Sequence, residues 1–416
     1  MDKIVIQGGI DLNGSVSISG AKNAVLPIMA AALLVEGVTV IENVPDLRDT
    51  RTMIRLLEMV GAKTTFRHHK LTVDARPVDT PVAPYDLVKT MRASFYVLGP
   101  LLSRFGEARV SLPGGCAWGP RPVDYHLKGL KKLGAVISLE GGYIQAKADY
   151  LTGAVVRFDM PSVGATGNLM MAAVRARGTT VIENAAREPE IVQLGEFLNR
   201  MGARVSGLGT DEITVEGVTA LHAANIRVIP DRIEAGTFLI AGAALGSIVL
   251  KDVEPRHLKV VIEKLEEAGA AIDVAEHTLK IRRADTIHPV NITTAGYPGF
   301  PTDLQAQWIA LMALANGTSI ITDTIYHDRF SHIPELSRLG ARITLEKNVA
   351  VVLGQDRLIG APVMSTDIRA SASLILAGLA AEGITEISRV YHIDRGYERI
   401  EEKFRTLGAS IRRVPE

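Results

Sequence analysis

The 416-residue sequence predicts an α/β fold in which six repeats are divided between two domains, with helices inside and small sheets outside. Two observations support this prediction. One pattern occurs six times along the chain: an apolar, Ala-rich helix, a strand, a loop, an amphipathic helix and a closing Gly-Ala pair. The chain also has more residues than a single hydrophobic core ordinarily organises, so two domains of similar size are expected.

Two sets of glycines mark the six copies. The first helix of each copy ends near a glycine of the first set, and the copy closes at a glycine of the second. The first set is Gly37, Gly106, Gly178, Gly246, Gly317 and Gly383, and the closing set is Gly61, Gly134, Gly202, Gly269, Gly340 and Gly408. The second copy is the longest, and its extra residues fall in segment 112–121, which holds the single cysteine. Insertions collect in surface loops that carry function, so we expect a functional loop there.

The two helices of a copy differ in polarity. The first is apolar on all sides, which predicts that it is buried all round. Examples are 24–34, 168–174, 237–245, 306–315 and 373–381. The second helix carries charges at helical spacing, as at 259–268 and 398–407, so one of its faces meets water. Short β-rich runs such as 38–42 and 319–322 follow the first helix and predict the outer sheets.

The domain boundary is predicted near residues 225–230, which separate the third copy from the fourth. The strand-like N-terminal residues before the first helix belong to no complete copy. From the pattern alone, they could pair with either domain.

The composition describes a globular protein and excludes several classes of function. Lys and Arg number 46, as do Asp and Glu, so no overall field attracts nucleic acid or an anionic membrane. The longest apolar run, 24–35, is interrupted by Pro27 and is too short to span a bilayer. Residues 1–7 alternate like a strand and lack the apolar stretch of a signal peptide. A single cysteine makes no internal disulfide, which fits a cytoplasmic protein.

Small and polar residues mark the predicted starts of the apolar helices, fourteen residues before each glycine of the first set. This row is Asn23, Arg92, Gly164, Arg232, Asp303 and Arg369, and beside it stand Lys22, Ser162, Asp231, Glu234, Thr302 and Asp367. Asn, Asp, Ser and Thr have a common alternative explanation here as helix caps. Lysine and arginine do not cap a helix start, and a cation there favours a bound anion. The row as a whole therefore predicts anion binding.

Further arginines occur in the loops after the first strands. They are Arg187, Arg329 and Arg395, and Arg121 lies in the long loop of the second copy. Because guanidinium groups match the geometry of carboxylates and phosphates, these loops predict a small, strongly anionic substrate.

Cys116 lies between glycines, just before a Gly-Pro-Arg-Pro sequence, which predicts a loop and not a core. A lone cysteine is usually a small buried hydrophobe. The loop context and the nearby Arg121 instead favour a reactive thiolate. The sequence has no HExxH, no CxxC, no P-loop and no GxGxxG after a strand, so neither a metal nor a cofactor is expected.

Eight motifs, taken in order along nearly the whole chain, together resemble one enzyme family. In sequence order they are 19–24 (SGAKNA), 89–94 (KTMRAS), 112–116 (LPGGC), 121–124 (RPVD), 183–190 (ENAAREPE), 300–303 (FPTD), 366–371 (TDIRAS) and 392–398 (HIDRGYE). The family is the UDP-N-acetylglucosamine enolpyruvyl transferases, also called UDP-N-acetylglucosamine 1-carboxyvinyltransferases. The resemblance implies a two-domain inside-out α/β barrel with three repeats per domain. It assigns residues 22–229 to an N-terminal domain carrying the Cys116 loop, and residues 1–21 with 230–416 to a C-terminal domain.

The resemblance also implies a reaction, in which the enolpyruvyl group of phosphoenolpyruvate moves to the 3′-hydroxyl of UDP-N-acetylglucosamine and phosphate is released. This reaction is the first committed step of peptidoglycan synthesis. The two substrates are then the expected partners, with no nucleic acid, no membrane and no obligate protein partner.

The family roles carry over to matching residues of this chain. Lys22, Arg121 and Arg395 are expected to hold phosphoenolpyruvate, with Arg92 and Arg369 balancing further negative charge. Asn23 stabilises the tetrahedral intermediate, Asp303 is the general base on the sugar hydroxyl, and Cys116 protonates the methylene carbon. The expected nucleotide-sugar contacts are Arg121, Pro122, Val123, Asp124, Tyr125, Ser162, Val163, Gly164 and Ile325. Because the cysteine is kept, the family inhibitor fosfomycin, which alkylates it, is expected to inactivate this protein.

Three other functions remain as alternatives. The first is 5-enolpyruvylshikimate-3-phosphate synthase, which shares the architecture and the donor. The loop cysteine and segment 185–190 favour the nucleotide sugar instead. The second is a non-catalytic sensor of UDP-N-acetylglucosamine, against which stand Asp303 and Cys116. The third, a repeat scaffold for partner proteins, needs exposed concave surfaces, whereas these repeats bury their helices.

Overall fold

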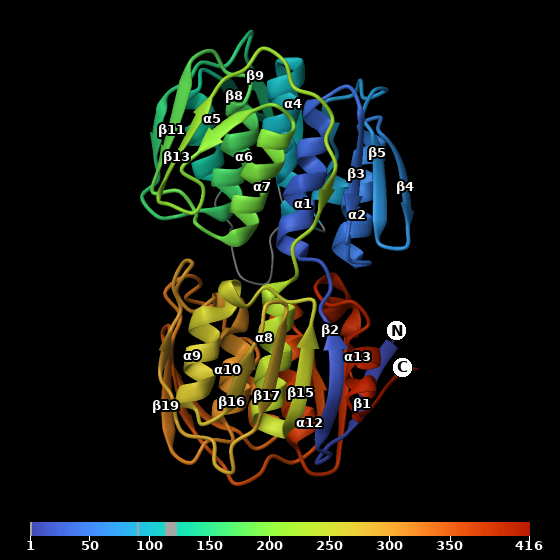
Figure 1. Ribbon diagram of the computed structural model, residues 1–416, viewed down its shortest axis with the longest axis vertical. Coiled ribbons are helices and arrows are strands. Elements are labelled where there is room, and N and C mark those ends of the chain that lie inside the picture. The colour runs from blue at the N-terminus through green and yellow to red at the C-terminus, as the bar shows by residue number, and fades with distance from the viewer. Residues whose placement is uncertain (1, 90, 113–122) are drawn as a thin grey trace. The chain divides into compact units, whose positions relative to one another are not determined.

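The computed structural model of the chain describes residues 2–89, 91–112 and 123–416 (Figure 1). The chain forms two compact units. The N-terminal unit is Gly20–Ile229, and the C-terminal unit is Pro230–Glu416 together with the residues up to Ser19. The chain therefore passes from one unit to the other twice, after Ser19 and after Ile229.

Over the described residues, each unit carries three four-stranded sheets. In the N-terminal unit the strand orders are β14-β3-β5-β4, β6-β7-β9-β8 and β10-β11-β13-β12. The strands are β3 (Val38–Glu42), β4 (Lys63–Arg67), β5 (Lys70–Asp74), β6 (Val82–Ala83), β7 (Glu107–Ser111), β8 (Val136–Glu140), β9 (Tyr143–Lys147), β10 (Val155–Arg157), β11 (Thr179–Glu183), β12 (Arg204–Ser206), β13 (Glu212–Glu216) and β14 (Ile226–Arg227).

The C-terminal unit repeats this arrangement, with strand orders β16-β17-β15-β2, β18-β19-β21-β20 and β22-β23-β1-β24. The strands are β1 (Asp2–Gln7), β2 (Leu12–Ser17), β15 (Gly246–Lys251), β16 (Ala271–Val274), β17 (Thr278–Arg282), β18 (Ile292–Thr293), β19 (Thr318–Thr322), β20 (Arg342–Glu346), β21 (Val349–Leu353), β22 (Pro362–Met364), β23 (Ile384–Ser388) and β24 (Ser410–Pro415).

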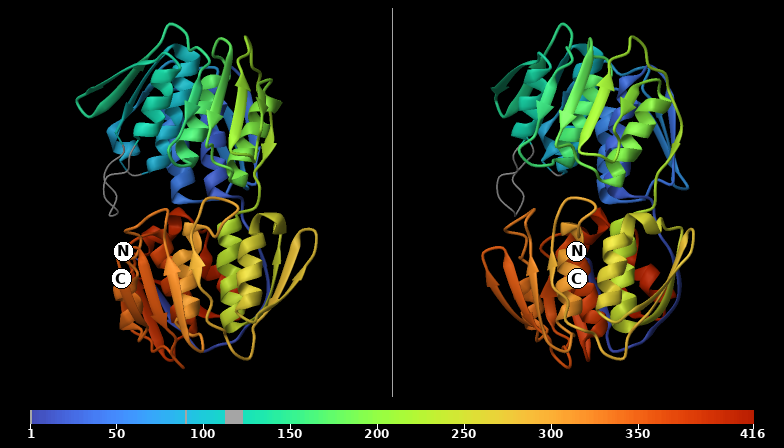
Figure 2. Two further views of the ribbon diagram at one scale, coloured as in Figure 1. Left: turned by 90° about the vertical axis from the view of Figure 1, so that its left-hand side faces the viewer. Right: turned by 60° about the vertical axis from the view of Figure 1, so that its left-hand side comes forward.

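The first helix of each repeat lies inside its unit, and the sheets lie outside (Figures 1 and 2). These helices are α1 (Lys22–Ala31), η2 (Arg92–Val97) with α4 (Leu98–Phe105), α6 (Val163–Ala173), α8 (Arg232–Leu245), η4 (Thr302–Leu304) with α10 (Gln305–Met312), and α12 (Ile368–Ala380). Helix α10 is buried at every residue, and α12 at every residue from Arg369 to Leu379. The prediction of an α/β fold with helices apolar on all sides and buried within the repeats is therefore confirmed.

The second helices are amphipathic, and several short helices join the main elements. The second helices are α2 (Arg48–Met59), α5 (Asp124–Lys132), α7 (Pro189–Arg200), η3 (Pro255–Leu258) with α9 (Lys259–Glu267), α11 (Ile333–Arg338) and α13 (Ile400–Thr406). The short ones are η1 (Ala32–Leu34), α3 (Tyr85–Val88) and η5 (Val390–Arg395). The last helix was expected from residue 398 but begins at Ile400, because Arg399 takes a left-handed conformation with φ of 45°.

The closing Gly-Ala pair of a repeat ends its second helix. In the first repeat, Gly61 has φ of +106°, and its N–H donates to the carbonyl of Glu58 at 3.0 Å. The N–H of Ala62 then donates back to Leu57 O at 2.9 Å. This is a Schellman-type cap, which needs a left-handed residue that glycine adopts without steric cost. The repeated Gly-Ala signature is therefore a helix stop.

The N-terminal strands complete two sheets of the C-terminal unit. Strand β1 pairs antiparallel with both β23 and β24, so the two ends of the chain lie side by side (Figure 1). Strand β2 pairs in parallel with β15. Conversely, β14 precedes α8 along the chain but pairs with β3 of the N-terminal unit. The strands before α1 and α8 are thus exchanged between the units, which explains why the N-terminal residues belong to no complete repeat.

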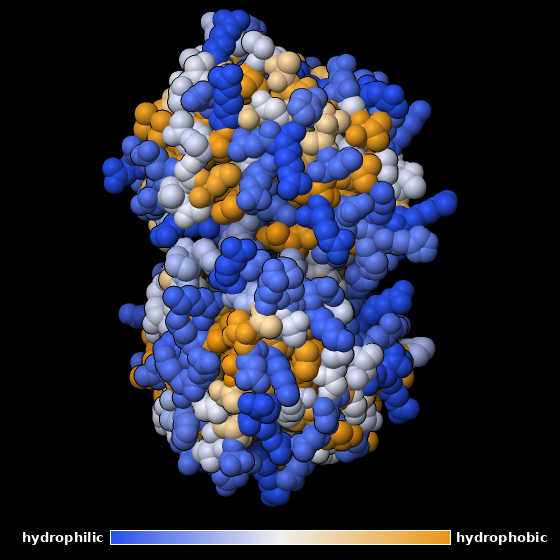
Figure 3. All heavy atoms as spheres, in the orientation of Figure 1, coloured by the Kyte–Doolittle hydropathy of each residue, from blue (hydrophilic) through white to orange (hydrophobic). Residues whose placement is uncertain are grey.

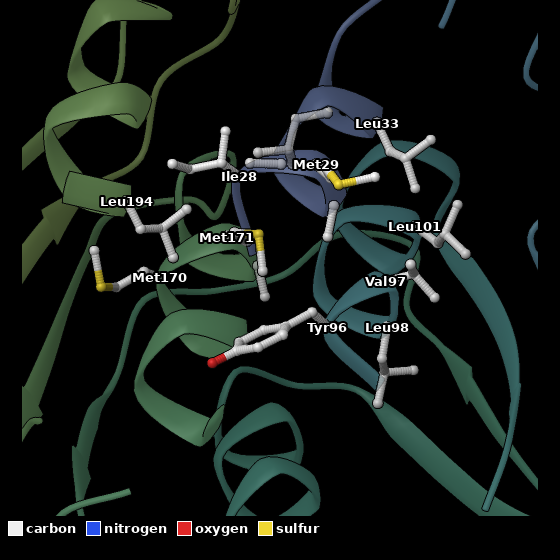
Figure 4. Packing of buried hydrophobic residues seen from close by; sticks show 14 of the residues in the cluster. Ile28, Met29, Leu33, Tyr96, Val97, Leu98, Leu101, Met170, Met171 and Leu194 are labelled. Carbon is white, nitrogen blue, oxygen red and sulfur yellow. The ribbon is translucent and has the colours of Figure 1, made fainter. Parts of the chain in front are cut away.

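Each unit has its own hydrophobic core. In the N-terminal unit, Ile28 and Met29 of α1 belong to one buried cluster with Val97 and Met171 from the neighbouring helices (Figure 4). Hydrophilic side chains dominate the visible face of each unit in Figure 3, and hydrophobic ones lie in small groups among them. Over the described part of the chain, no helix has the length and apolar character needed to cross a membrane.

Candidate active site

Asp303 lies between two arginines at the start of the fifth buried helix. Its Oδ2 is 2.6 Å from Nη2 of Arg369, and its Oδ1 is 2.8 Å from Nη2 of Arg329. The side chains of the arginines are 7% and 17% exposed, and that of Asp303 is 22% exposed. Because each oxygen has its own guanidinium partner, the carboxylate is held in one orientation and its charged form is stabilised.

A buried tyrosine contacts the guanidinium of Arg369 through Nη1, the nitrogen that does not bind Asp303. The hydroxyl of Tyr397 lies 3.5 Å from Nη1 of Arg369, 2.8 Å from Oγ1 of Thr237 and 3.1 Å from Nε2 of Gln307. Burial by itself would lower the pKa of Arg369, but Asp303, Tyr397 and Asp231 together raise that pKa. Burial raises the pKa of Tyr397. The guanidinium therefore stays charged and the phenol stays protonated.

Three of the polar residues beside the helix starts are N-caps. Oγ of Ser162 accepts a hydrogen bond from the Ala165 N–H at 3.3 Å. Asp231 accepts from the N–H groups of residues 233 and 234, and Asp367 from those of residues 369 and 370. The capping explanation is therefore correct for these side chains.

The remaining polar neighbours of the helix starts bind other groups of the protein. Glu234 is buried and lies 2.7 Å from Nζ of Lys403, and burial raises its pKa although this lysine lowers it. Thr302 donates to Oδ2 of Asp323 at 2.7 Å. These two side chains do not cap their helices.

The cations at two helix starts have carboxylate partners within their own units. Lys22 lies 3.8 Å from Oδ2 of Asp49, which is 4% exposed, and Arg369 is paired with Asp303 as described above. Carboxylates of the protein therefore lie beside both cations, a pairing that the sequence alone did not indicate. Asp49 gave no signal, because it is one of many acids in amphipathic helices.

Two segments expected to contact the nucleotide sugar are close together in the N-terminal unit. Asp124 and Tyr125 begin α5, Ser162 caps α6, Gly164 lies in the first turn of α6, and these two helices pack against each other. The buried His126 of α5 faces α6. Its Nε2 is so close to Gly164 that a Cβ added to this glycine would stand 3.1 Å away. Val123 precedes α5, and Val163 is the first residue of α6.

The other predicted site residues lie on separate elements. Asn23 is in the first turn of α1, and Arg395 ends η5. Arg413 fixes the residue before Arg395, with Nη2 2.6 Å from Oδ1 of Asp394. Ile325 follows β19. Cys116, Arg121 and Pro122 lie outside the described residues, as does the side chain of Arg92.

Comparison with known proteins first defines the class. A family described as EPSP synthase (3-phosphoshikimate 1-carboxyvinyltransferase) matches residues 6–404. The enolpyruvyl transferase NikO from Streptomyces tendae superimposes with a TM-score of 0.91 at 28% identity, over 100% of this chain and 99% of that one. An EPSP synthase from Acinetobacter baumannii gives 0.78 at 18% identity over 100% of both chains, which shows the shared fold. The fold is that of the enolpyruvyl transferases.

More similar relatives specify the family. A UDP-N-acetylglucosamine 1-carboxyvinyltransferase from Desulfosudis oleivorans is 55% identical over 415 residues, covering 100% of both chains. One from Chloroherpeton thalassium is 57% identical over 417 residues, covering 99% of this chain and 97% of its own. The chain belongs to the family of UDP-N-acetylglucosamine 1-carboxyvinyltransferases. The resemblance seen in the sequence is thereby confirmed.

Proposed function

We propose that this protein transfers the enolpyruvyl group of phosphoenolpyruvate to the 3′-hydroxyl of UDP-N-acetylglucosamine and releases phosphate. The observation that carries the proposal is Asp303, held between Arg329 and Arg369 in a chain more than half identical to relatives of that name. The synthase of 5-enolpyruvylshikimate 3-phosphate is less well supported, since its solved example is 18% identical.

The reaction proceeds by addition and elimination. Asp303 accepts the proton of the sugar hydroxyl while the hydroxyl oxygen bonds to C2 of phosphoenolpyruvate. A proton from Cys116 adds to C3, which gives a tetrahedral intermediate that Asn23 stabilises. The Cys116 thiolate then takes a proton back from C3, which restores the double bond as the bond between C2 and the phosphate oxygen breaks. The proton held by Asp303 leaves with the released phosphate. The atoms balance without a metal or a cofactor.

Charge complementarity explains how so anionic a donor is held. Phosphoenolpyruvate carries a carboxylate and a phosphate, and Lys22, Arg121 and Arg395 bind them in this proposal. Arg92 and Arg369 balance further negative charge, because guanidinium forks match planar and tetrahedral oxyanions. The nucleotide sugar is contacted by residues 121–125, by residues 162–164 and by Ile325.

The reaction defines the place of the protein in the cell. Its product is the first committed intermediate of peptidoglycan, so the protein acts in cell-wall synthesis and thereby in cell shape and division. We assign it to the cytoplasm, since a single cysteine fits a reducing compartment. Its proposed partners are the two substrates.

The test is phosphate release from phosphoenolpyruvate with and without UDP-N-acetylglucosamine, for wild type and Cys116→Ala side by side. Release that requires the nucleotide sugar and collapses in the variant supports the proposal. Release with shikimate 3-phosphate in its place would assign the protein to the other synthase. Tight binding of the nucleotide sugar without turnover of either acceptor would identify a sensor.

A further inference from the structure

Asp323 is a fully buried carboxylate that the proposed mechanism does not use. It follows β19 directly, is 0% exposed and accepts four hydrogen bonds from side chains and backbone. A buried carboxylate is costly unless donors surround it, so its place in the core needs a reason. Three of these four donors come from two regions that carry proposed site residues, and the fourth is Thr294.

The first oxygen of Asp323 fixes the loop that carries Ile325. Oδ1 accepts from the backbone N–H groups of Ile325 and Tyr326, each at 2.9 Å, and from Oγ1 of Thr294 at 2.8 Å. Oγ1 of Thr294 in turn accepts from the Thr324 N–H at 3.1 Å. An acidic side chain that binds the N–H groups two and three residues ahead sets the conformation of the turn. One oxygen thus determines how Ile325 is presented.

The second oxygen connects to the proposed base. Oδ2 accepts from Oγ1 of Thr302 at 2.7 Å, and that hydroxyl accepts from Nη1 of Arg329 at 3.2 Å. Nη2 of the same arginine lies 2.8 Å from Oδ1 of Asp303. Asp323 therefore reaches the base through one threonine and one arginine, and Thr302 is also the chain neighbour of Asp303.

The backbone of Asp323 is held independently of its side chain. Its N–H donates to the carbonyl of Asn348 at 2.9 Å, and its carbonyl accepts from Nδ2 of Asn348 at 3.0 Å. The carboxylate is therefore a fixed point from which the two branches extend.

We propose that Asp323 is a positioning residue that holds the Asp303 base and the Ile325 loop in a fixed mutual geometry. This inference rests on the proposed function, because it is the nucleotide sugar that needs both groups at once. The 3′-hydroxyl of the nucleotide sugar must reach Asp303 while its nucleotide part contacts Ile325. Small misplacement of a reacting group is costly in rate, so one shared anchor serves both binding and chemistry.

Each branch can be weakened alone by a nearly isosteric change. Thr302→Val removes the hydroxyl between Asp323 and Arg329, so kcat should fall about tenfold while KM for UDP-N-acetylglucosamine changes less than twofold. Thr294→Val removes a donor on the loop side. KM for UDP-N-acetylglucosamine should therefore rise about fivefold, while kcat changes less than twofold. KM for phosphoenolpyruvate should stay constant in both variants.

Thr385→Val provides the matched control. Thr385 lies on β23 of the same unit, is fully buried, and its hydroxyl bonds to no group among the described residues. Its kinetic constants should stay within about twofold of wild type. Asp323→Asn should combine both effects, and adding Thr302→Val to it should lower kcat by less than the product of the single effects.

Steady-state kinetics on the folded variants, with melting temperatures, test the assignment. The expected result is the opposite split between Thr302→Val and Thr294→Val. If kcat and KM of both variants match those of the Thr385→Val control, the positioning role of Asp323 is overturned. The same holds if activity and melting temperature fall alike in both variants. Neither result affects the proposed function. A wild type that is inactive with UDP-N-acetylglucosamine would instead overturn the proposed function, and the positioning role with it.

Discussion

The starts of two buried helices carry cations of different chemistry, α1 in the N-terminal unit and α12 in the C-terminal unit. Arg369 lies 2.6 Å from its carboxylate partner Asp303, whereas Lys22 lies 3.8 Å from Asp49, which is longer than a hydrogen bond. Both carboxylates offset a cation at the positive end of a helix dipole. Only the planar guanidinium fixes the orientation of its partner. The C-terminal pair thus holds the proposed base in place, and the N-terminal pair balances the charge of an ammonium group.

The largest effect is expected from a reagent that leaves both pairs intact. Saturating fosfomycin should abolish activity, because we expect it to alkylate the Cys116 thiol that supplies a proton in the proposed mechanism. Activity after preincubation and the intact mass of the protein measure this directly. Cys116→Ala should gain no mass from the reagent. Unchanged wild-type activity after preincubation would contradict the prediction and the role of the cysteine.

Removing the base breaks the C-terminal side of the comparison. Asp303→Asn should lower kcat about a thousandfold, because the amide cannot accept the hydroxyl proton and leaves two guanidiniums without their carboxylate. Phosphate release at saturating substrates is the measurement. Asp328→Asn, an exposed acid in the same unit, serves as the control and should retain activity. A loss smaller than tenfold in Asp303→Asn would mean that another group is the base.

The N-terminal side is tested by changing each member of its pair. Lys22→Ala should raise KM for phosphoenolpyruvate about 10- to 100-fold, since a charged hydrogen bond to the substrate is lost. Asp49→Asn should have a smaller effect, below about fivefold, because its oxygen is beyond hydrogen-bond distance from Nζ. Equal effects of the two changes would show that Asp49 orients the lysine as tightly as Asp303 is oriented by arginine.

The smallest effect concerns the tyrosine behind Arg369. Tyr397→Phe removes one hydroxyl that contacts Thr237, Gln307 and Arg369, so kcat should fall only a few-fold while the free energy of unfolding falls by about 1–3 kcal/mol. Denaturant unfolding and kinetics measure the two quantities. Tyr150→Phe, at a 54% exposed position, should change neither. A thousandfold loss of kcat would place the phenol in the chemistry itself.

The site was only partly predictable from the sequence, and the residues show why. Asp303 and Arg369 were singled out by their position at helix starts, a local pattern repeated six times. Arg329 was identified as a loop arginine, but its contact with Asp303 was not foreseen. Asp49 and Asp323 gave no signal, because acids are common in amphipathic helices and at the ends of strands. Tyr397 belongs to the motif 392–398, but its contact with Arg369 was not foreseen. Their roles follow from contacts over long sequence separations.

By itself the sequence determined the six repeats, the burial of their first helices and the glycine stop of their second ones. These properties depend on residue period, polarity and backbone preference within a short segment. The tertiary structure alone decided that β1 completes the sheet of β23 and β24, and that Asp303 meets an arginine 66 residues away. Such pairings depend on how a whole unit packs, because many strands and many arginines are locally equivalent until the core fixes which of them are neighbours.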